Sequence, residues 1–198
     1  KLSNFAPSTW PYEESVKMFE NSLKYLRTDY VDYLLLHAVG GGGLDNLHAR
    51  YLDNGVLKYL QDKREEGVIR NLGFSYHGDI EVFDYLLQQM DEGNMHWDFV
   101  QIQLNYVDWK ASDDEEPLSV NANYLYRELE KRNIPAVIME PLLGGRLASL
   151  PEPIVRQLKE RRPDDSVASW AFRFAGSEPG ILTVLSGMTY MEHLIDNV

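Results

Sequence analysis

The sequence predicts an α/β fold in which helices cover a parallel β-sheet. Five short runs, rich in β-branched and aromatic residues, are nearly continuously apolar: 30–36, 68–75, 99–104, 134–139 and 181–185. Strands that are buried on both faces have this composition. The segments between the runs are long enough for crossover helices. This alternation of strands and helices predicts a parallel sheet with helices packed on it.

The connecting segments show helical periodicity. In residues 12–26, Val16, Phe19 and Leu23 recur at helical spacing. The same spacing occurs in the segments 79–90, 121–132, 152–162 and 165–175.

Boundary residues agree with these elements. Asp79 and one of the pair Asp164 and Asp165 are expected as N-caps, and Gly67 and Gly176 as C-caps. The stretch 109–120, WKASDDEEPLSV, is acidic and rich in turn residues, so we expect an exposed loop.

Composition excludes several classes of function. The 198 residues are enough for one domain, 1–198, with a substantial core, and they carry a net charge of −12. An acidic surface argues against nucleic acid or an anionic membrane as partner. The chain has no cysteine, no apolar segment of membrane-spanning length and no apolar signal sequence at its start. We therefore expect a cytoplasmic protein without disulfides, Cys-ligated metal or a membrane partner.

Two architectures satisfy the pattern: an open doubly wound sheet and an eight-stranded barrel. Five runs do not reach eight strands, but the chain begins at Lys1 without an initiator Met, and residues 1–5 can be the exit from an earlier strand. We favour a (β/α)8 TIM barrel whose N-terminal strands precede this sequence.

Polar residues follow or end each apolar run. In parallel α/β folds the carboxyl ends of the strands converge on one face, where active sites lie. Each residue has a structural explanation by itself: His37 can cap a loop, Glu140 can pair with Arg146, and residues 40–43 can be a plain glycine loop. The joint pattern points to a site. Its members are His37, Ser75, Tyr76, His77, Gln101, Gln103, Asn105, Glu140 and Ser186.

Six motifs then occur in a fixed order: VDYLLLH, GVIRNLGFSYH, FVQIQLNY, IPAVIMEPLLGGRL, SVASWAFRF and TVLSGMTYMEHLIDN. In this order, over essentially the whole chain, the sequence resembles the second two-thirds of an aldo-keto reductase. The resemblance implies a barrel that transfers hydride from NADP(H) or NAD(H) to a small aldehyde or ketone. The branch it most resembles can carry a cysteine-rich iron–sulfur tail, which would lie beyond Val198.

The resemblance also implies a catalytic tetrad of Asp, Tyr, Lys and His. By motif position His37 is the tetrad histidine, which orients and polarises the carbonyl, and Lys1 is the tetrad lysine. An ammonium beside a tyrosine lowers the pKa of the phenol, which is otherwise near 10. The Asp and the Tyr precede the lysine in the family and match no residue here. We therefore expect these 198 residues alone to be inactive.

Cofactor contacts carry over in part. Ser75 and Gln101 match the positions that bind the nicotinamide carboxamide, whereas Met139 replaces the usual stacking tyrosine. Positions that bind the 2′-phosphate of NADP carry no Lys or Arg here, which leaves the choice of NADP or NAD open. The remaining cofactor positions are Glu140, Pro141, Leu142, Gly144, Gly145, Arg146, Gly187, Met188, Thr189, His193, Asp196 and Asn197.

Two alternatives remain. A metal-dependent barrel hydrolase would use His37, His77 and Glu140 as ligands, with Asn105 completing the set. A non-catalytic relative would keep the barrel for binding. The substrate depends on the loops 38–54 and 107–120, whose composition names no ligand, and the oligomeric state is equally open.

Overall fold

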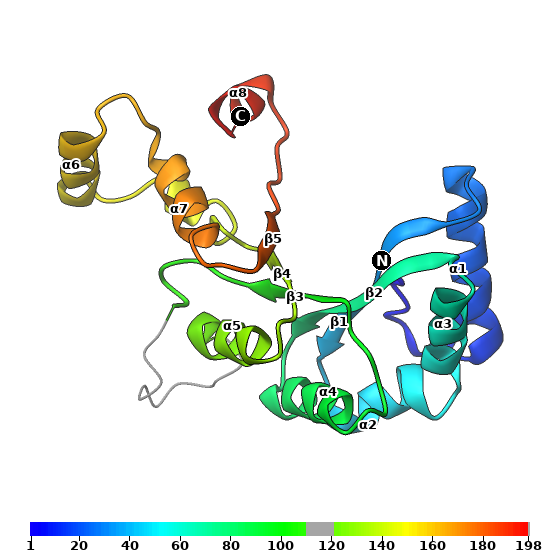
Figure 1. The fold of residues 1–198 in the computed structure, drawn as a ribbon. Coiled ribbons are helices and arrows are strands. Elements are labelled where there is room, and N and C mark those ends of the chain that lie inside the picture. Colours follow the sequence, from blue (N-terminus) through cyan, green and yellow to red (C-terminus); the bar gives the residue numbers. More distant parts are fainter. Residues whose placement is uncertain (110–120, 198) are drawn as a thin grey trace. The chain divides into compact units, whose positions relative to one another are not determined.

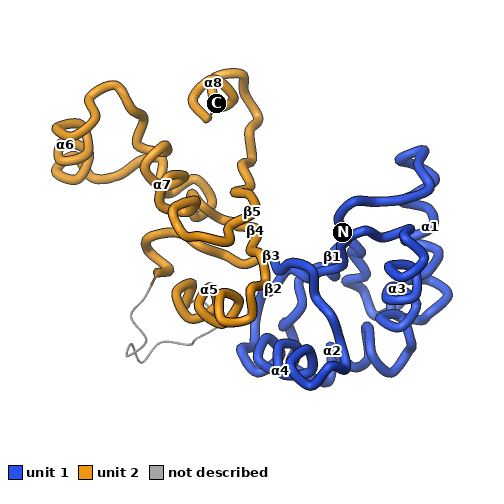
Figure 2. The backbone as a smooth tube through the Cα atoms, viewed as in Figure 1, with its two compact units in different colours: residues 1–101, 117–119 blue, residues 102–116, 120–198 orange. Residues whose placement is uncertain are grey.

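The computed structural model of the protein describes residues 1–109 and 121–197. Within these residues the chain forms two compact units, the first comprising residues 1–101 and the second beginning at Ile102 (Figure 2). Five strands form one sheet in sequence order: β1 (Val31–Gly40), β2 (Ile69–His77), β3 (Phe99–Gln103), β4 (Ala136–Met139) and β5 (Ile181–Val184) (Figure 1). The pairs β1–β2, β2–β3 and β4–β5 are parallel. The predicted parallel α/β fold is confirmed.

The first unit builds its core around β1 and β2. Leu36, Leu72 and Phe74 are completely buried in these strands. Leu2 forms an isolated parallel bridge with Leu36, so the first residues run beside β1 as the end of a neighbouring strand would. The helices are α1 (Tyr12–Leu26), α2 (Gly43–Leu47), the π-helix η2 (His48–Leu52), α3 (Val56–Glu65) and α4 (Ile80–Asp91), with a 3₁₀ turn η1 (Pro7–Thr9) before α1.

The second unit contains the end of β3 together with β4 and β5. Ile102, Leu104 and Ile138 are completely buried in its core, and the Leu104 amide donates to the Met139 carbonyl at 3.2 Å. The helices are α5 (Ala122–Lys131), the 3₁₀ turn η4 (Arg146–Ala148), α6 (Glu152–Arg161), α7 (Val167–Ala175) and α8 (Met191–Asn197). No helix in the described part of the chain is both long and apolar enough to cross a membrane.

Three local predictions were wrong. The first strand does not end at His37 but continues to Gly40 through an irregularity between Leu36 and Val39. Residues 38–54 are not an open loop, because α2 and η2 lie within them. The N-cap of α7 is Ser166 and neither of the preceding aspartates, because the Ser166 hydroxyl accepts from the Ser169 amide at 3.0 Å.

Other boundaries were predicted correctly. Asp79 is the N-cap residue of α4 and Gly176 the C-cap residue of α7. Gly67 directly follows the α3 C-cap residue Glu66 with φ +80°, the left-handed conformation that glycine adopts there without strain. Most of the predicted acidic loop 109–120 lies outside the described residues.

Asp98, just before β3, anchors the first unit and should control its acid stability. Its carboxylate accepts two bonds from Arg64, at 2.5 and 2.6 Å, and one from the Leu72 amide at 2.8 Å. Burial alone would raise the pKa of Asp98, but these bonds and His96 outweigh burial and lower it. Asp98→Asn should therefore reduce the free energy of unfolding at pH 7 by about 2 kcal/mol. Urea denaturation of the full-length protein measures this.

The pH dependence gives the prediction its sign. Because the pKa of Asp98 is lower in the folded chain than its unfolded value of 3.8, the ionised carboxylate stabilises the fold at pH values above 3.8. This stabilisation is lost as the pH falls through the folded-state pKa. The difference between wild type and Asp98→Asn should therefore shrink in acid below pH 4. Asp32→Asn is the control, because the Asp32–Arg70 pair is more than half exposed and should contribute far less. Equal losses in the two variants would contradict the assignment.

Candidate active site

The irregularity in β1 contains His37, which has no register partner on β2. Leu36 pairs with Phe74 and Val39 with Tyr76, so His37 and Ala38 stand outside the pairing with β2. Ala38 adopts a left-handed φ of +51°, which its small side chain tolerates. Its amide donates to the Ser75 hydroxyl at 2.9 Å instead of to a strand carbonyl. A bulge of this kind redirects a side chain, here the imidazole.

The imidazole of His37 is held from one side. Its Nδ1 is 2.9 Å from the Ser3 hydroxyl, and its ring centroid lies 4.6 Å from that of Phe5. Nε2 makes no hydrogen bond within the described residues, so it can meet a ligand. Burial, and then the nearby charge of Lys1, lower the pKa of His37, so the ring is neutral at neutral pH.

This lowered pKa also affects stability. As the pH falls below about 6.5, the unfolded chain binds a proton at His37 before the folded chain does. The folded state is then disfavoured in acid by this group. A half-buried imidazole that stays neutral is the form that can donate one N–H to an oxygen.

Ser75 and Gln101 lie at the same level of the sheet as the His37 bulge. Ser75 on β2 is the register partner of Gln101 on β3, and both side chains are buried. The Ser75 hydroxyl contacts the Ala38 amide, next to His37. Three consecutive strands of the first unit thus bring the predicted residues together, although the roles given to them stay predictions.

The neighbours of Ser75 differ from each other. Tyr76 is buried, its hydroxyl donates a hydrogen bond of 2.6 Å to the Gly78 carbonyl, and its ring packs against Phe83. These contacts give Tyr76 a structural role. His77 is exposed and close enough to His37 to act on the pKa of that imidazole.

The second unit contains a cavity of about 410 Å³ within the size range of ligand sites. The loop after β4, helix α7, the residues after β5 and helix α8 form its walls. Its lining includes two acids and one histidine but no Lys or Arg. The predicted cofactor residues in this lining are Glu140, Pro141, Leu142, Gly144, Gly145, Gly187, His193, Asp196 and Asn197.

Four predicted cofactor residues lie elsewhere in this unit. Met139 is buried at the end of β4, and Met188 lines an adjoining open cavity of about 450 Å³. Arg146 is exposed at the start of η4, and the Thr189 amide donates to His193 Nδ1 at 3.3 Å.

The loop after β4 has an unusual backbone. Leu143, Gly144 and Gly145 have successive left-handed φ values of +48°, +64° and +88°. The Glu140 carboxylate accepts a bond of 2.7 Å from the Gly144 amide, and within the described residues it forms no ion pair with Arg146. In this turn the Gly144 amide donates to an anion, and here the anion is the protein's own carboxylate.

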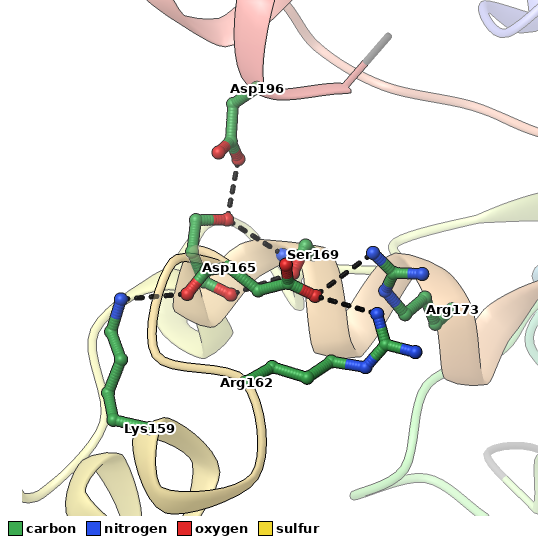
Figure 3. A network of polar contacts seen from close by, with 7 residues as sticks. Lys159, Arg162, Asp165, Ser169, Arg173 and Asp196 are labelled. Carbon is green, nitrogen blue, oxygen red and sulfur yellow. Dashed lines mark hydrogen bonds and ion pairs between the residues drawn. The ribbon is translucent and has the colours of Figure 1, made fainter.

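Two of the predicted cofactor residues, Asp196 and Asn197, bond helix α8 to neighbouring segments. Asp196 accepts from the Ser166 hydroxyl at 2.6 Å, and Asn197 donates to the Ser186 hydroxyl at 2.9 Å. In the same network Asp165 accepts from Arg162 at 3.3 Å and from Arg173 at 3.0 Å (Figure 3). The bond between Ser166 and Asp196 holds α8 beside the start of α7, and α8 lines the cavity.

Some residues beside the site had no sequence signal. Ser3 contacts the imidazole, and Arg50 donates to the His37 carbonyl at 2.9 Å from a segment interpreted as a loop. Neither belongs to a motif, so only the folded geometry identifies them. For the metal hypothesis, the described part of the chain contains no group of three or more His, Cys, Asp or Glu side chains able to hold an ion.

Comparison with known proteins identifies the family. The sequence matches the Aldo/keto reductase family over residues 2–198. Similar solved structures include an aldo/keto reductase from Brucella melitensis (22% identity, TM-score 0.67, covering 98% of this chain and 63% of that one). Another is aldo-keto reductase AKR11C1 from Bacillus halodurans (21% identity, TM-score 0.67, covering 92% of this chain and 60% of that one). No curated protein matches. The chain spans about three-fifths of these structures, and it belongs to the aldo/keto reductase family.

Proposed function

We propose that the full-length protein is a cytoplasmic, nicotinamide-dependent oxidoreductase that reduces a small aldehyde or ketone. The observation that supports this most is the His37 imidazole, kept neutral beside buried Ser75 and Gln101 on consecutive strands. We take residues 1–198 to be one barrel domain whose first strands precede Lys1.

His37 would act directly on the substrate. With Nδ1 engaged by Ser3, its Nε2 would donate a hydrogen bond to the carbonyl oxygen and stabilise the negative charge that develops there. Lys1 is close enough to His37 to influence its pKa, which suits the tetrad role that the resemblance gives it. The resemblance assigns the proton donor to a tyrosine ahead of Lys1.

The cofactor would supply the hydride, and this chain would hold it at several points. Ser75 and Gln101 would bind the carboxamide of the nicotinamide, with Met139 as an apolar neighbour. The left-handed loop at Leu143, Gly144 and Gly145 would present backbone amides to the pyrophosphate. The cavity bordered by α8 would hold the adenosine.

The acids in this cavity favour NAD(H) over NADP(H). Glu140 and Asp196 line it, and its lining offers no Lys or Arg to a 2′-phosphate. A phosphate there would meet negative charge without fixed positive charge to offset it.

Glu140 should weaken dinucleotide binding. Its carboxylate occupies the Gly144 amide and must leave before a phosphate oxygen can accept from that N–H. Glu140→Gln should therefore tighten NADH binding by the full-length protein about 10-fold, near the lower end of what one charged hydrogen bond contributes. Calorimetric titration measures the affinity. Glu152→Gln, an exposed acid on α6, is the charge control, and weaker or unchanged binding in Glu140→Gln would contradict the prediction.

The function is tested with the full-length protein and both reduced cofactors. We expect NADH to quench the tryptophan fluorescence and to be oxidised when small aldehydes or ketones are added. Failure to bind either cofactor would refute the proposal. Binding without turnover on a broad panel of carbonyl compounds would instead support the non-catalytic alternative.

A further inference from the structure

Arg50 is a buried cation without a carboxylate partner among the described residues. It lies on η2 with 6% of its surface exposed. Its guanidinium donates to the carbonyls of His37 at 2.9 Å and Ala38 at 3.3 Å, to Asn4 Oδ1 at 3.3 Å and to the Tyr51 hydroxyl at 3.0 Å. Burying a charge is costly unless hydrogen bonds compensate it, so this arrangement needs an explanation.

The two carbonyls belong to the bulge in β1. His37 and Ala38 stand outside the register with β2, so their backbone groups need partners other than that strand. The His37 amide donates to the Leu2 carbonyl at 3.3 Å, and the Ala38 amide donates to the Ser75 hydroxyl. Arg50 supplies donors for both carbonyls. One side chain thus completes the hydrogen bonding of the segment that carries the imidazole.

Two neighbours fix Arg50 in turn. The Tyr51 hydroxyl donates to Asn4 Oδ1 at 2.7 Å, and Asn4 is completely buried. Burial is the main cause that raises the pKa of Tyr51 to about 12, so the phenol stays protonated and keeps this bond. The planar fork of Arg50 suits a task in which two carbonyls must be held in a set geometry.

We propose that Arg50 is a positioning residue that holds the His37–Ala38 bulge and thereby aims the imidazole at the substrate carbonyl. The inference rests on the proposed function for its effect on catalysis. Its structural part, control of the His37 ring by Arg50, stands independently. Neighbouring groups that act on the charge of His37 are the two amino groups of Lys1, His77 and Arg50.

The test uses Arg50→Met, Arg50→Lys and Tyr51→Phe in the full-length protein. Arg50→Met removes both carbonyl bonds and should lower kcat about 100-fold, the effect of a small misplacement of a catalytic group. The dissociation constant for NADH should change less than about twofold, because Arg50 contacts no proposed cofactor residue other than through the bulge. Arg50→Lys, which keeps the charge but loses the fork, should restore only part of kcat.

Nuclear magnetic resonance measures the ring signals and the pKa of His37, and this measurement does not depend on catalytic activity. Arg50→Met should shift the ring signals of His37 and raise its pKa, since one nearby positive charge is lost. Tyr51→Phe leaves both carbonyl bonds in place but removes one bond that fixes the guanidinium, so its effect on kcat and on the ring signals should lie between those of wild type and Arg50→Met.

The outcomes separate the two proposals. A folded Arg50→Met with wild-type kcat and unchanged His37 signals would overturn the role of Arg50. If Arg50→Met does not fold, the same result in Arg50→Lys would overturn it. A wild-type protein without carbonyl reduction would refute the proposed function, while the His37 signals would still decide whether Arg50 positions the ring.

Discussion

Replacing His37 with alanine should lower carbonyl reduction by the full-length protein about 10²- to 10⁴-fold, the range expected when a group acting on the reacting atoms is removed. The affinity for NADH should stay nearly unchanged, because His37 lies beside the carboxamide-binding residues without being one of them. Lowered kcat with unchanged cofactor binding identifies an interaction made in the transition state. Steady-state rates and fluorescence titration measure the two quantities.

His77→Ala is the matched control. His77 is the last residue of β2 and is exposed, and its charge lowers the pKa of His37. Its removal should change kcat by less than about threefold, as expected for an exposed group whose charge is screened by solvent. Equal, large losses in both variants would favour a shared ligand site and the metal-dependent alternative. An unaltered rate in His37→Ala would remove the proposed role of this residue.

Local sequence patterns predicted most of the secondary structure. Residues 12–26 form α1 over the range of their apolar periodicity. The spacing of the apolar residues within the segment marks the face of an amphipathic helix that becomes buried. All five predicted strands occur, since each is a continuous apolar run between polar segments. The parallel direction of the pairs β1–β2, β2–β3 and β4–β5 followed from the crossover segments between the strands.

Features decided by tertiary contacts were not predictable in this way. Residues 38–54 were interpreted as a loop, yet α2 and η2 lie within them, where Arg50 and Tyr51 find buried partners on the bulge and on Asn4. The bulge itself depends on Ser75, thirty-seven positions later in the chain. No local pattern contains that information.

The candidate site likewise contains residues that local sequence patterns predict and residues that only tertiary contacts identify. His37, Ser75 and Gln101 were predictable because parallel strands bring their carboxyl ends to one face. Arg50 was not, because it acts through backbone carbonyls, which any residue carries. Glu140 was identified as a site residue, but its bond to the Gly144 amide depends on three successive left-handed residues that the sequence shows only as two glycines.

Gly73→Ala should reduce the free energy of unfolding by about 3 kcal/mol and also weaken cofactor binding. Gly73 is buried in β2, and a Cβ built there would lie 2.2 Å from the Phe99 carbonyl oxygen and 2.8 Å from the Phe99 ring. Gly73 and Phe99 are register partners, so β3 must move away from β2 to admit the methyl group. Ser75 and Gln101 are paired two residues further along, and the same movement would separate them.

The comparison with Gly41→Ala isolates this cause. A Cβ at Gly41 meets no atom within 4 Å and the residue is exposed, so this variant should change stability by less than about 0.5 kcal/mol. Urea denaturation and NADH titration of the two full-length variants measure both effects. Loss of stability with unchanged NADH affinity would show that Ser75 and Gln101 do not act as a pair. Gly73→Ala with wild-type stability would show that β2 and β3 are not packed as closely as their register requires.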